Sequence, residues 1–341
     1  MRRFLCAALA ALMLLSLAAC GQDDPGTEST DDVTAAVTQQ ASATAEPTEE
    51  PAKGCHDVVS LDFINTFDRT PSMEEQPVYD KDGLTLTAKS LEYDPVDGPT
   101  IMLSVRNDTD RDLLIQNDYT TVNGYMIKPD VDIQIRPGKK SEAPMSISYL
   151  GLAMADIHSL SEVEFSLRIL DSKTYEVIGT TPPVKLTLTG TQPPAEPDTS
   201  GQLAYDADGV RVILRGIKHD TMFESDSVLM VYMENNTDKT ISVQNSKLTV
   251  NGCDITATMG TVLLPHKRAV DKIDLFNSDL DEHGIASLDS VDVTFEINDY
   301  EEWKPIAKTD SVALEPLMIE PASEIPAGEE KAEEAATAPT E

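Results

Sequence analysis

An internal duplication constrains this chain more than any other feature of its sequence. The stretch Asn107-Asp108-Thr109-Asp110 returns 128 positions later as Asn235-Asn236-Thr237-Asp238. The same spacing relates Val122-Asn123-Gly124 to Val250-Asn251-Gly252. Single residues also keep it, among them Pro137 and Pro265, Lys139 and Lys267, Asp171 and Asp299, and Val184 and Val312. The chain therefore carries two copies of one module. Tyr79-Asp80 and Tyr205-Asp206 lie only 126 positions apart, so the second copy has two additional residues between its first two strands.

Within each copy the apolar residues alternate with period two, which indicates half-buried β-strands. We expect strands at the alternating stretches Leu84–Ala88, Ile101–Val105, Val131–Ile135, Val163–Ile169, Val228–Tyr232 and Val291–Ile297. Asn-Gly, Asp-Gly and Pro-Gly pairs between such stretches form turns. No long stretch shows the 3.6-residue period of a helix, so the pattern predicts an all-β sandwich of seven or eight strands for each copy. Short helical turns are expected only near Gly151–Ile157 and Ser278–His283.

The first twenty residues have the pattern of an export signal. Arg2 and Arg3 precede an uncharged apolar run, Phe4–Ala19, which is short for a permanent membrane span. The run ends in Leu17-Ala18-Ala19-Cys20, which resembles the lipobox of bacterial lipoproteins. The resemblance implies that Cys20 becomes the lipidated N-terminus of the mature protein and anchors it to the outer face of the cell membrane. A secretory signal whose cleavage site contains a cysteine by chance is the alternative.

Composition divides the rest of the chain. Residues 21–53 are rich in Thr, Ala, Asp, Glu, Gln and Pro and offer little to bury, which is typical of a disordered tether. We expect a signal peptide at 1–19, a lipidated cysteine and largely disordered linker at 20–76, repeat 1 at 77–190, a Pro-rich linker at 191–202, repeat 2 at 203–318 and an acidic disordered tail at 319–341. No second hydrophobic stretch of membrane length follows the signal.

Charge narrows the range of partners. Asp and Glu number 60 against 26 Lys and Arg, which gives a formal net charge of −34. Nucleic acid is excluded as a partner because binding phosphates needs clustered lysine and arginine. The charge instead favours a basic protein or a partner bridged by cations.

Several motifs in order resemble a family of immunoglobulin-like modules found in lipoproteins and surface proteins of Gram-positive bacteria. They are Asn107-Asp108-Thr109, Val122-Asn123-Gly124-Tyr125-Met126, Pro137-Gly138-Lys139-Lys140 and Leu170-Asp171-Ser172-Lys173-Thr174-Tyr175, with counterparts in repeat 2. The resemblance implies two tandem immunoglobulin-like β-sandwiches in an extracellular position, and no established activity. Repeat 2 departs from the pattern at Cys253, where repeat 1 has Tyr125, and at His266, where repeat 1 has Gly138. Because glycine tolerates positive φ, we expect the turn at His266 to be rebuilt.

No motif in the sequence predicts catalysis, a metal site or a cofactor. Asp80-Lys81-Asp82-Gly83 and Asp206-Ala207-Asp208-Gly209 have the carboxylates that begin a calcium loop, but such pairs before an alternating strand are more often turns. The Asn-x-Thr sequons at Asn107 and Asn235 are likewise interpreted as turn formers. The five histidines and the serines show no zinc or nucleophile spacing.

Two features stay open between alternatives. Cys55 and Cys253 could form a disulfide outside the cell, although two unpaired thiols, with Cys253 partly buried, are favoured. Tyr175 and Trp303 occupy equivalent positions after a strand. They could be exposed contacts for a glycan or protein partner, or they could pack against the sandwich at a strand corner. Packing is the ordinary explanation.

Together these patterns predict a non-catalytic, lipid-anchored binding or scaffolding protein of the bacterial cell envelope, with an envelope protein or a glycan as its partner. The alternative is a ligand- or cation-binding receptor subunit of a transport or sensing system. A hydrolase with a site assembled between the modules is a third hypothesis.

Overall fold

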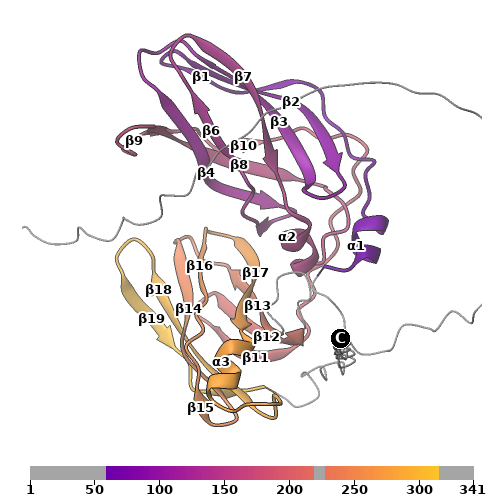
Figure 1. Ribbon diagram of the computed structural model, residues 1–341, viewed down its shortest axis with the longest axis vertical. Helices are drawn as coiled ribbons and strands as arrows, with labels where there is room; N and C mark the ends of the chain where they lie inside the picture. Colours follow the sequence, from indigo (N-terminus) through magenta and orange to yellow (C-terminus); the bar gives the residue numbers. More distant parts are fainter. Residues whose placement is uncertain (1–58, 219–226, 315–341) are drawn as a thin grey trace, which may run out of the picture. The chain divides into compact units, whose positions relative to one another are not determined.

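The computed structural model describes residues 59–218 and 227–314. All of these residues belong to one compact unit, Pro51–Glu341. Strands dominate the described residues, which also contain three helices of six residues each (Figure 1). The predicted all-β, sandwich-type fold is confirmed.

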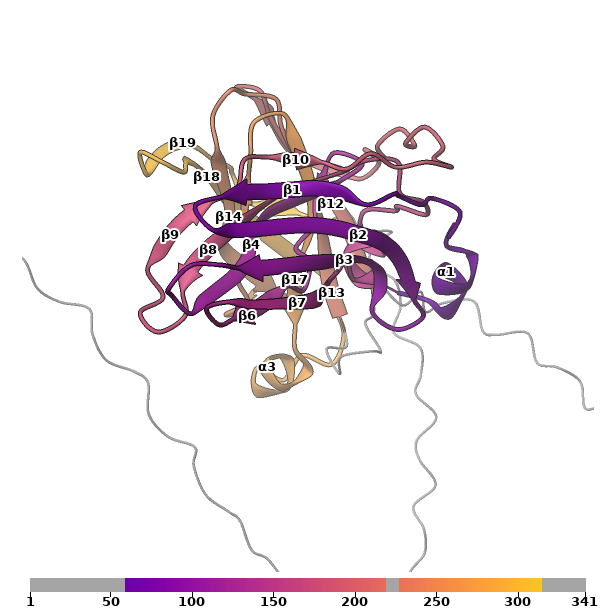
Figure 2. The ribbon, with the colours of Figure 1, turned by 90° about the horizontal axis from the view of Figure 1, so that it is seen from above.

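Repeat 1 forms two facing antiparallel sheets. Its elements are α1 (Leu61–Thr66), β1 (Gln76–Lys81), β2 (Leu84–Asp94), β3 (Gly98–Asn107), β4 (Leu113–Val122), β5 (Tyr125–Met126), β6 (Asp132–Ile135), β7 (Lys139–Ser146), α2 (Tyr149–Met154), β8 (Val163–Asp171), β9 (Val177–Thr180) and β10 (Val184–Lys185). One sheet has the order β1-β2-β3-β7, and Figure 2 shows these strands side by side. The other has the order β10-β8-β4-β5, with β6 on β4 and β9 on β8. Fully buried side chains of both sheets, such as Leu86, Leu103, Ile115 and Phe165, form the core.

Repeat 2 has the same order of elements apart from a counterpart of α1. They are β11 (Gln202–Ala207), β12 (Val210–Lys218), β13 (Ser227–Asn235), β14 (Ile241–Val250), β15 (Cys253–Asp254), β16 (Gly260–Leu263), β17 (Lys267–Leu275), α3 (Asn277–Glu282), β18 (Val291–Asp299), β19 (Lys304–Lys308) and β20 (Val312–Ala313). The sheets are β11-β12-β13-β17 and β15-β14-β18-β19, with β16 on β14 and β20 on β18. Each repeat thus has eight strands of four residues or more and two strands of two residues among its described residues. The predicted helical turns correspond to α2 and α3.

The folded part of repeat 1 begins earlier than its sequence indicated. Residues 59–76, expected to be linker, contain α1, and Val59, Phe63 and Phe67 are buried in the core of repeat 1. Ser60 caps the helix by accepting a hydrogen bond from the Phe63 N–H at 3.0 Å. A helix of six residues is too short to show a periodic pattern, so only the apolar residues in it and on either side of it could have indicated it.

A buried asparagine holds the same hairpin end in each repeat. The Asn235 amide nitrogen donates to the carbonyl oxygens of Lys239 at 2.8 Å and Leu263 at 3.2 Å, while its oxygen accepts from the N–H and hydroxyl of Thr237 at 3.0 and 2.7 Å. Asn107 makes the corresponding bonds in repeat 1. Both asparagines are fully buried. The turn interpretation of the two sequons is therefore confirmed.

The turn at His266 is not rebuilt, so that prediction is wrong. His266 has φ 57°, close to the 66° of Gly138 in repeat 1. The hairpin keeps the same closing bond in both copies, from Lys139 N–H to Arg136 oxygen and from Lys267 N–H to Leu264 oxygen. Left-handed backbone costs a non-glycine residue about 1–2 kcal/mol, and the surrounding hydrogen bonds exceed that cost. The imidazole Nε2 of His266 lies 3.0 Å from a carboxylate oxygen of Asp238.

Replacing Asn235 by alanine tests the buried clamp. The change leaves several buried backbone groups without a partner, so we expect the free energy of unfolding to fall by about 2–3 kcal/mol in urea titrations. Asn236→Ala, at the exposed neighbouring position, is the matched control and should cost less than about 0.5 kcal/mol. Equal losses in the two variants would contradict a special role for the buried amide.

Candidate functional site

A short strand of repeat 1 joins the two repeats into one continuous sheet. Tyr125 on β5 pairs in parallel with Arg268 on β17, which makes a sheet of ten strands. The Arg268 N–H donates to the Gly124 oxygen at 3.2 Å, and its guanidinium carbon lies 5.2 Å from the centre of the Tyr125 ring. The Tyr125 ring also meets the Tyr232 ring edge-on, with centroids 6.5 Å apart. Tyr125 is therefore the central contact of this junction.

Strand β13 is buried on both of its faces because of this junction. Leu229, Val231 and Met233 face the core of repeat 2. Tyr232 belongs instead to the core cluster of repeat 1, and Val228 and Met230 pack with Met154 of α2 in a separate small cluster. The alternation Val228, Met230, Tyr232 predicted the strand correctly, but these side chains do not face the core of their own repeat. The signal was the unbroken apolar run 228–233, since a strand buried on both faces does not alternate.

Truncating Tyr125 should uncouple the repeats. We expect Tyr125→Ala to remove about 3 kcal/mol of buried contact and to split one unfolding transition into two, as seen by scanning calorimetry. Cys253→Ala changes the matching position of repeat 2 and serves as the control, with a single transition retained. One unsplit transition for Tyr125→Ala would show that other contacts couple the repeats.

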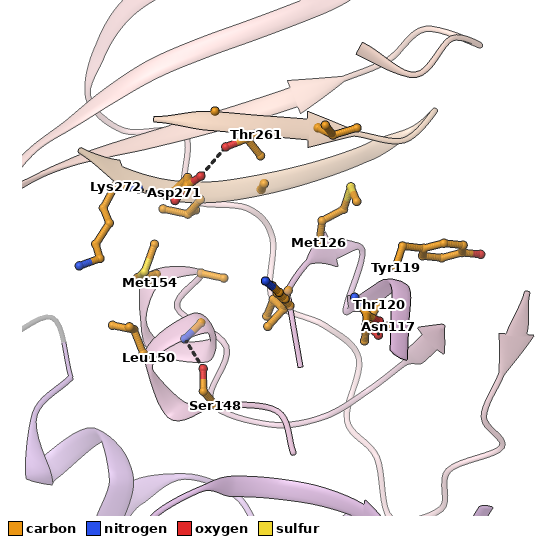
Figure 3. Close-up of a pocket in the computed structure, with 18 of the residues that line it drawn as sticks. Asn117, Tyr119, Thr120, Met126, Ser148, Leu150, Met154, Thr261, Asp271 and Lys272 are labelled. Carbon is orange, nitrogen blue, oxygen red and sulfur yellow. Dashed lines mark hydrogen bonds between the residues drawn. The ribbon is translucent and has the colours of Figure 1, made fainter. Parts of the chain in front are cut away.

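A cavity of about 530 Å³ lies beside the junction. Repeat 1 lines it with residues of β4, β5, β8 and α2 and of the segment that follows β5, and repeat 2 lines it with residues of β16 and β17. Figure 3 shows Met154 and Leu150 of α2 on one side and the strand with Asp271 and Lys272 on the other. The Asp271 carboxylate accepts a hydrogen bond from the Thr261 hydroxyl, which fixes both side chains at this wall.

Each repeat also presents an exposed aromatic residue at a hairpin tip. Tyr175, between β8 and β9, is 66% exposed, and Trp303, between β18 and β19, is 68% exposed. Both have left-handed backbone, with φ of 59° and 51°. The expected packing at a strand corner is therefore wrong for both. How far each side chain is exposed depends on the path of its hairpin, whereas the sequence showed only that Tyr175 and Trp303 occupy equivalent positions in the two repeats.

The two tips are built by an aspartate at the same position. The Asp171 carboxylate accepts from the N–H groups of Lys173 and Thr174 at 3.0 and 3.1 Å, and these bonds hold its pKa below the usual value. The Asp299 carboxylate does the same with the N–H groups of residues 301 and 302. The Lys239 ammonium 2.7 Å away is the main cause of its lowered pKa. Each turn is thus held by side-chain to backbone bonds that need no aromatic residue.

Apolar and acidic groups surround Tyr175 and Trp303 at the two hairpin tips. Val177 and Ile178 are exposed beside Tyr175, and Tyr300 lies beside Trp303 with ring centroids 5.7 Å apart. Acidic neighbours at the tips are Asp112, Glu176, Glu301 and Glu302. Lysines Lys173 and Lys304 pair with Asp112 at 2.9 Å and Glu302 at 2.8 Å. We call Tyr175 and Trp303, together with these neighbours, the aromatic tips.

Of the three cysteines with a predicted role, only Cys253 lies among the described residues. Cys20, the predicted lipidation site, and Cys55 lie outside the described residues. Cys253 on β15 is half-buried and has no disulfide partner among the described residues. Its pairing with Cys55 stays a prediction.

The two Asp-Gly sites form turns. Asp82 and Asp208 have φ of 52° and 53°, each followed by a glycine of positive φ. The carboxylate of Asp206 pairs with the Arg211 guanidinium at 3.0 Å, and that of Asp208 accepts from the Tyr205 hydroxyl at 2.8 Å. Within residues 59–218 and 227–314, no group of three or more His, Cys, Asp or Glu is arranged to hold a metal ion.

In the described part of the chain, no helix has both the length and the apolar character that crossing a membrane requires.

Comparisons with known proteins place the chain in no family. No family model matches it, and no curated protein matches its sequence. Among solved structures, the YadV chaperone is similar at 13% identity over 63% of this chain and 92% of the chaperone, with a TM-score of 0.21. A DUF4785 family protein from Legionella pneumophila is similar at 12% identity over 68% of this chain and 57% of its own, with a TM-score of 0.22. Red sea bream transglutaminase is similar at 11% identity over 70% of this chain and 32% of its own, with a TM-score of 0.19. At such TM-scores the likenesses carry no argument about function.

Proposed function

We propose that this protein is a non-catalytic binding protein of the bacterial cell envelope. Lipid on Cys20 anchors it at the outer face of the cell membrane, and the aromatic tips bind a basic protein partner. The observation that carries the proposal is the pair of exposed aromatic residues, Tyr175 and Trp303, at equivalent positions and with positive φ in both repeats.

Neither aromatic side chain is needed for folding of its turn. Asp171 and Asp299 form the turns through backbone N–H groups. Left-handed backbone costs a non-glycine residue about 1–2 kcal/mol, and exposure of a large ring gains nothing from burial. A glycine or asparagine would fit either turn at lower cost. The aromatic side chains therefore support contact with another molecule, because local stability favours their replacement.

The surroundings of the tips favour a cationic partner. Lysine and arginine side chains bind aromatic faces through cation–π contacts, and nearby carboxylates strengthen the attraction. Glu176 and Glu301 supply such carboxylates without an ion-pair partner among the described residues. The formal charge of −34 steers basic proteins toward the whole surface. Two linked tips gain avidity where a partner offers repeated cationic sites.

Removing the aromatic tips should abolish partner capture. In cross-linking on intact cells followed by mass spectrometry, we expect one dominant envelope protein with a basic surface. The double variant Tyr175→Ala/Trp303→Ala should reduce its capture at least tenfold, because aromatic anchors dominate binding energy at interfaces.

The matched control is Val96→Ala/Leu203→Ala, which removes two other exposed apolar side chains. All variants should keep the wild-type melting temperature, since these positions are exposed. Capture that is unaffected by the double tip variant would contradict the proposal.

The anchor is tested separately with Cys20→Ala. Loss of the lipid should move the protein from the membrane fraction to the soluble fraction, because the acyl chains on Cys20 are the proposed attachment to the membrane. Mass spectrometry of the N-terminal peptide should show the acyl-glyceryl mass only in the wild type. If the wild type carries no lipid and is already released, the signal is an ordinary secretory one.

A further inference from the structure

The cavity beside the junction has the size of a small-molecule site. Its volume of about 530 Å³ lies within the range of roughly 300–1,000 Å³ that is usual for ligand pockets. Both repeats contribute to its wall, so the site exists only while the junction is formed. Its residues are separate from the aromatic tips, so the cavity does not depend on the proposed function.

One part of the cavity wall is apolar and adaptable. Met126, Leu150, Met154 and Val270 line it, and Met154 and Leu150 stand on successive turns of α2. In Figure 3, Met126 and the α2 side chains extend toward the strand of repeat 2 that crosses above them. Methionine thioethers have three rotatable bonds and fit irregular apolar ligands. This part of the wall suits an alkyl chain.

Cations border the cavity on either side of β4. Arg168 lies opposite Gln116 on the neighbouring strand, and its Nε donates to the Asn117 oxygen at 3.3 Å. Lys128 follows Ile127, whose N–H donates to the Thr120 oxygen at 3.0 Å. Among the described residues, no carboxylate lies within ion-pair distance of either cation. Both are exposed at the cavity rim.

The remaining charged groups of the lining are one paired lysine and two carboxylates. Lys272 donates to an Asp274 carboxylate oxygen at 2.5 Å, and Asp271 accepts from Thr261. Asp118 is exposed at the rim. Asp274 offsets Lys272, and the two lining carboxylates, Asp118 and Asp271, equal the other two cations, Arg168 and Lys128, in number. Arg168 and Lys128, which have no carboxylate partner in the described part of the chain, favour an anionic group at the rim.

We propose that the cavity binds a single-chain amphiphile with an anionic head, a carboxylate or a phosphate. The alkyl chain lies against Met126, Leu150 and Met154, and the head group meets Arg168 and Lys128 at the rim. Carboxylates and phosphates both accept paired N–H bonds from a guanidinium, so the two head groups share one recognition chemistry.

Isothermal titration of the full mature chain tests the site with four probes below their micelle concentrations. These are dodecanoate, dodecyl phosphate, dodecyltrimethylammonium and inorganic phosphate. We expect saturable one-to-one binding of at least one anionic amphiphile, with the tighter of the two identifying the natural head group. The ammonium amphiphile and inorganic phosphate should bind at least tenfold more weakly.

A charge-matched pair of variants assigns the binding to this cavity. Arg168→Ala/Lys128→Ala should raise the Kd of the anionic amphiphile at least tenfold. Arg136→Ala/Lys140→Ala removes two exposed cations of repeat 1 that do not line the cavity, and should leave the Kd unchanged. Melting temperatures of both variants check that each is folded.

Three outcomes would overturn the proposal. The first is no saturable binding of either anionic amphiphile, and the second is equal affinity for the ammonium probe. The third is an equal loss of affinity in the two double variants, which would show general charge attraction rather than a site.

Discussion

The docking of Tyr125 against repeat 2 is the interaction on which the rest of this structure depends. The ring contacts both the Arg268 guanidinium and the Tyr232 ring, and the adjoining backbone extends the sheet from β5 to β17. Burial raises the pKa of the Tyr125 hydroxyl, although Arg268 opposes the shift. The apolar outer face of β13 is covered only because this contact holds. The cavity exists for the same reason.

The junction includes one destabilising group, the buried hydroxyl of Tyr232, whose cost apolar contacts must offset. The Tyr232 side chain is fully buried, and its hydroxyl has no hydrogen-bond partner among the described residues. Burial raises its pKa to about 12. A buried polar atom without a partner costs about 1–3 kcal/mol. Burial of the two rings and the neighbouring aliphatic side chains offsets this cost at roughly 25 cal/mol per Å² of apolar surface.

The two repeats kept their framework and diverged on their outer faces. The buried asparagines make corresponding hydrogen bonds in both copies, and both Asp-Gly turns accept a backbone N–H at the glycine oxygen. The aspartates of the aromatic tips each accept from two backbone N–H groups. In contrast, the apolar Val228 and the aromatic Tyr232 correspond to the small polar residues Thr100 and Ser104 in repeat 1. Tyr125 corresponds to Cys253. After the duplication, repeat 2 therefore has an apolar outer face on β13, and repeat 1 has Tyr125, the side chain that packs against it.

Much of the local structure could be predicted because it depends on residues near one another in the chain. Alternating apolar residues predicted the strands from Leu84–Ala88 to Val291–Ile297. The turns at Asn107 and Asn235 were predicted because Asn and Thr side chains readily form hydrogen bonds with the nearby backbone. Helix α1 was missed because six residues hold too little periodicity. The His266 turn was wrongly predicted because hydrogen bonds elsewhere in the hairpin keep its left-handed backbone.

The candidate sites depended on information that no single stretch contains. The sequence by itself determined that two all-β modules follow one another and that Tyr175 and Trp303 are equivalent. Only the tertiary structure decided that both aromatic residues are exposed, that β13 turns Tyr232 toward repeat 1, and that Arg168 and Lys128 share a cavity. Strand formation is driven by alternation within a few residues. Which face is covered depends on contacts between segments more than a hundred positions apart.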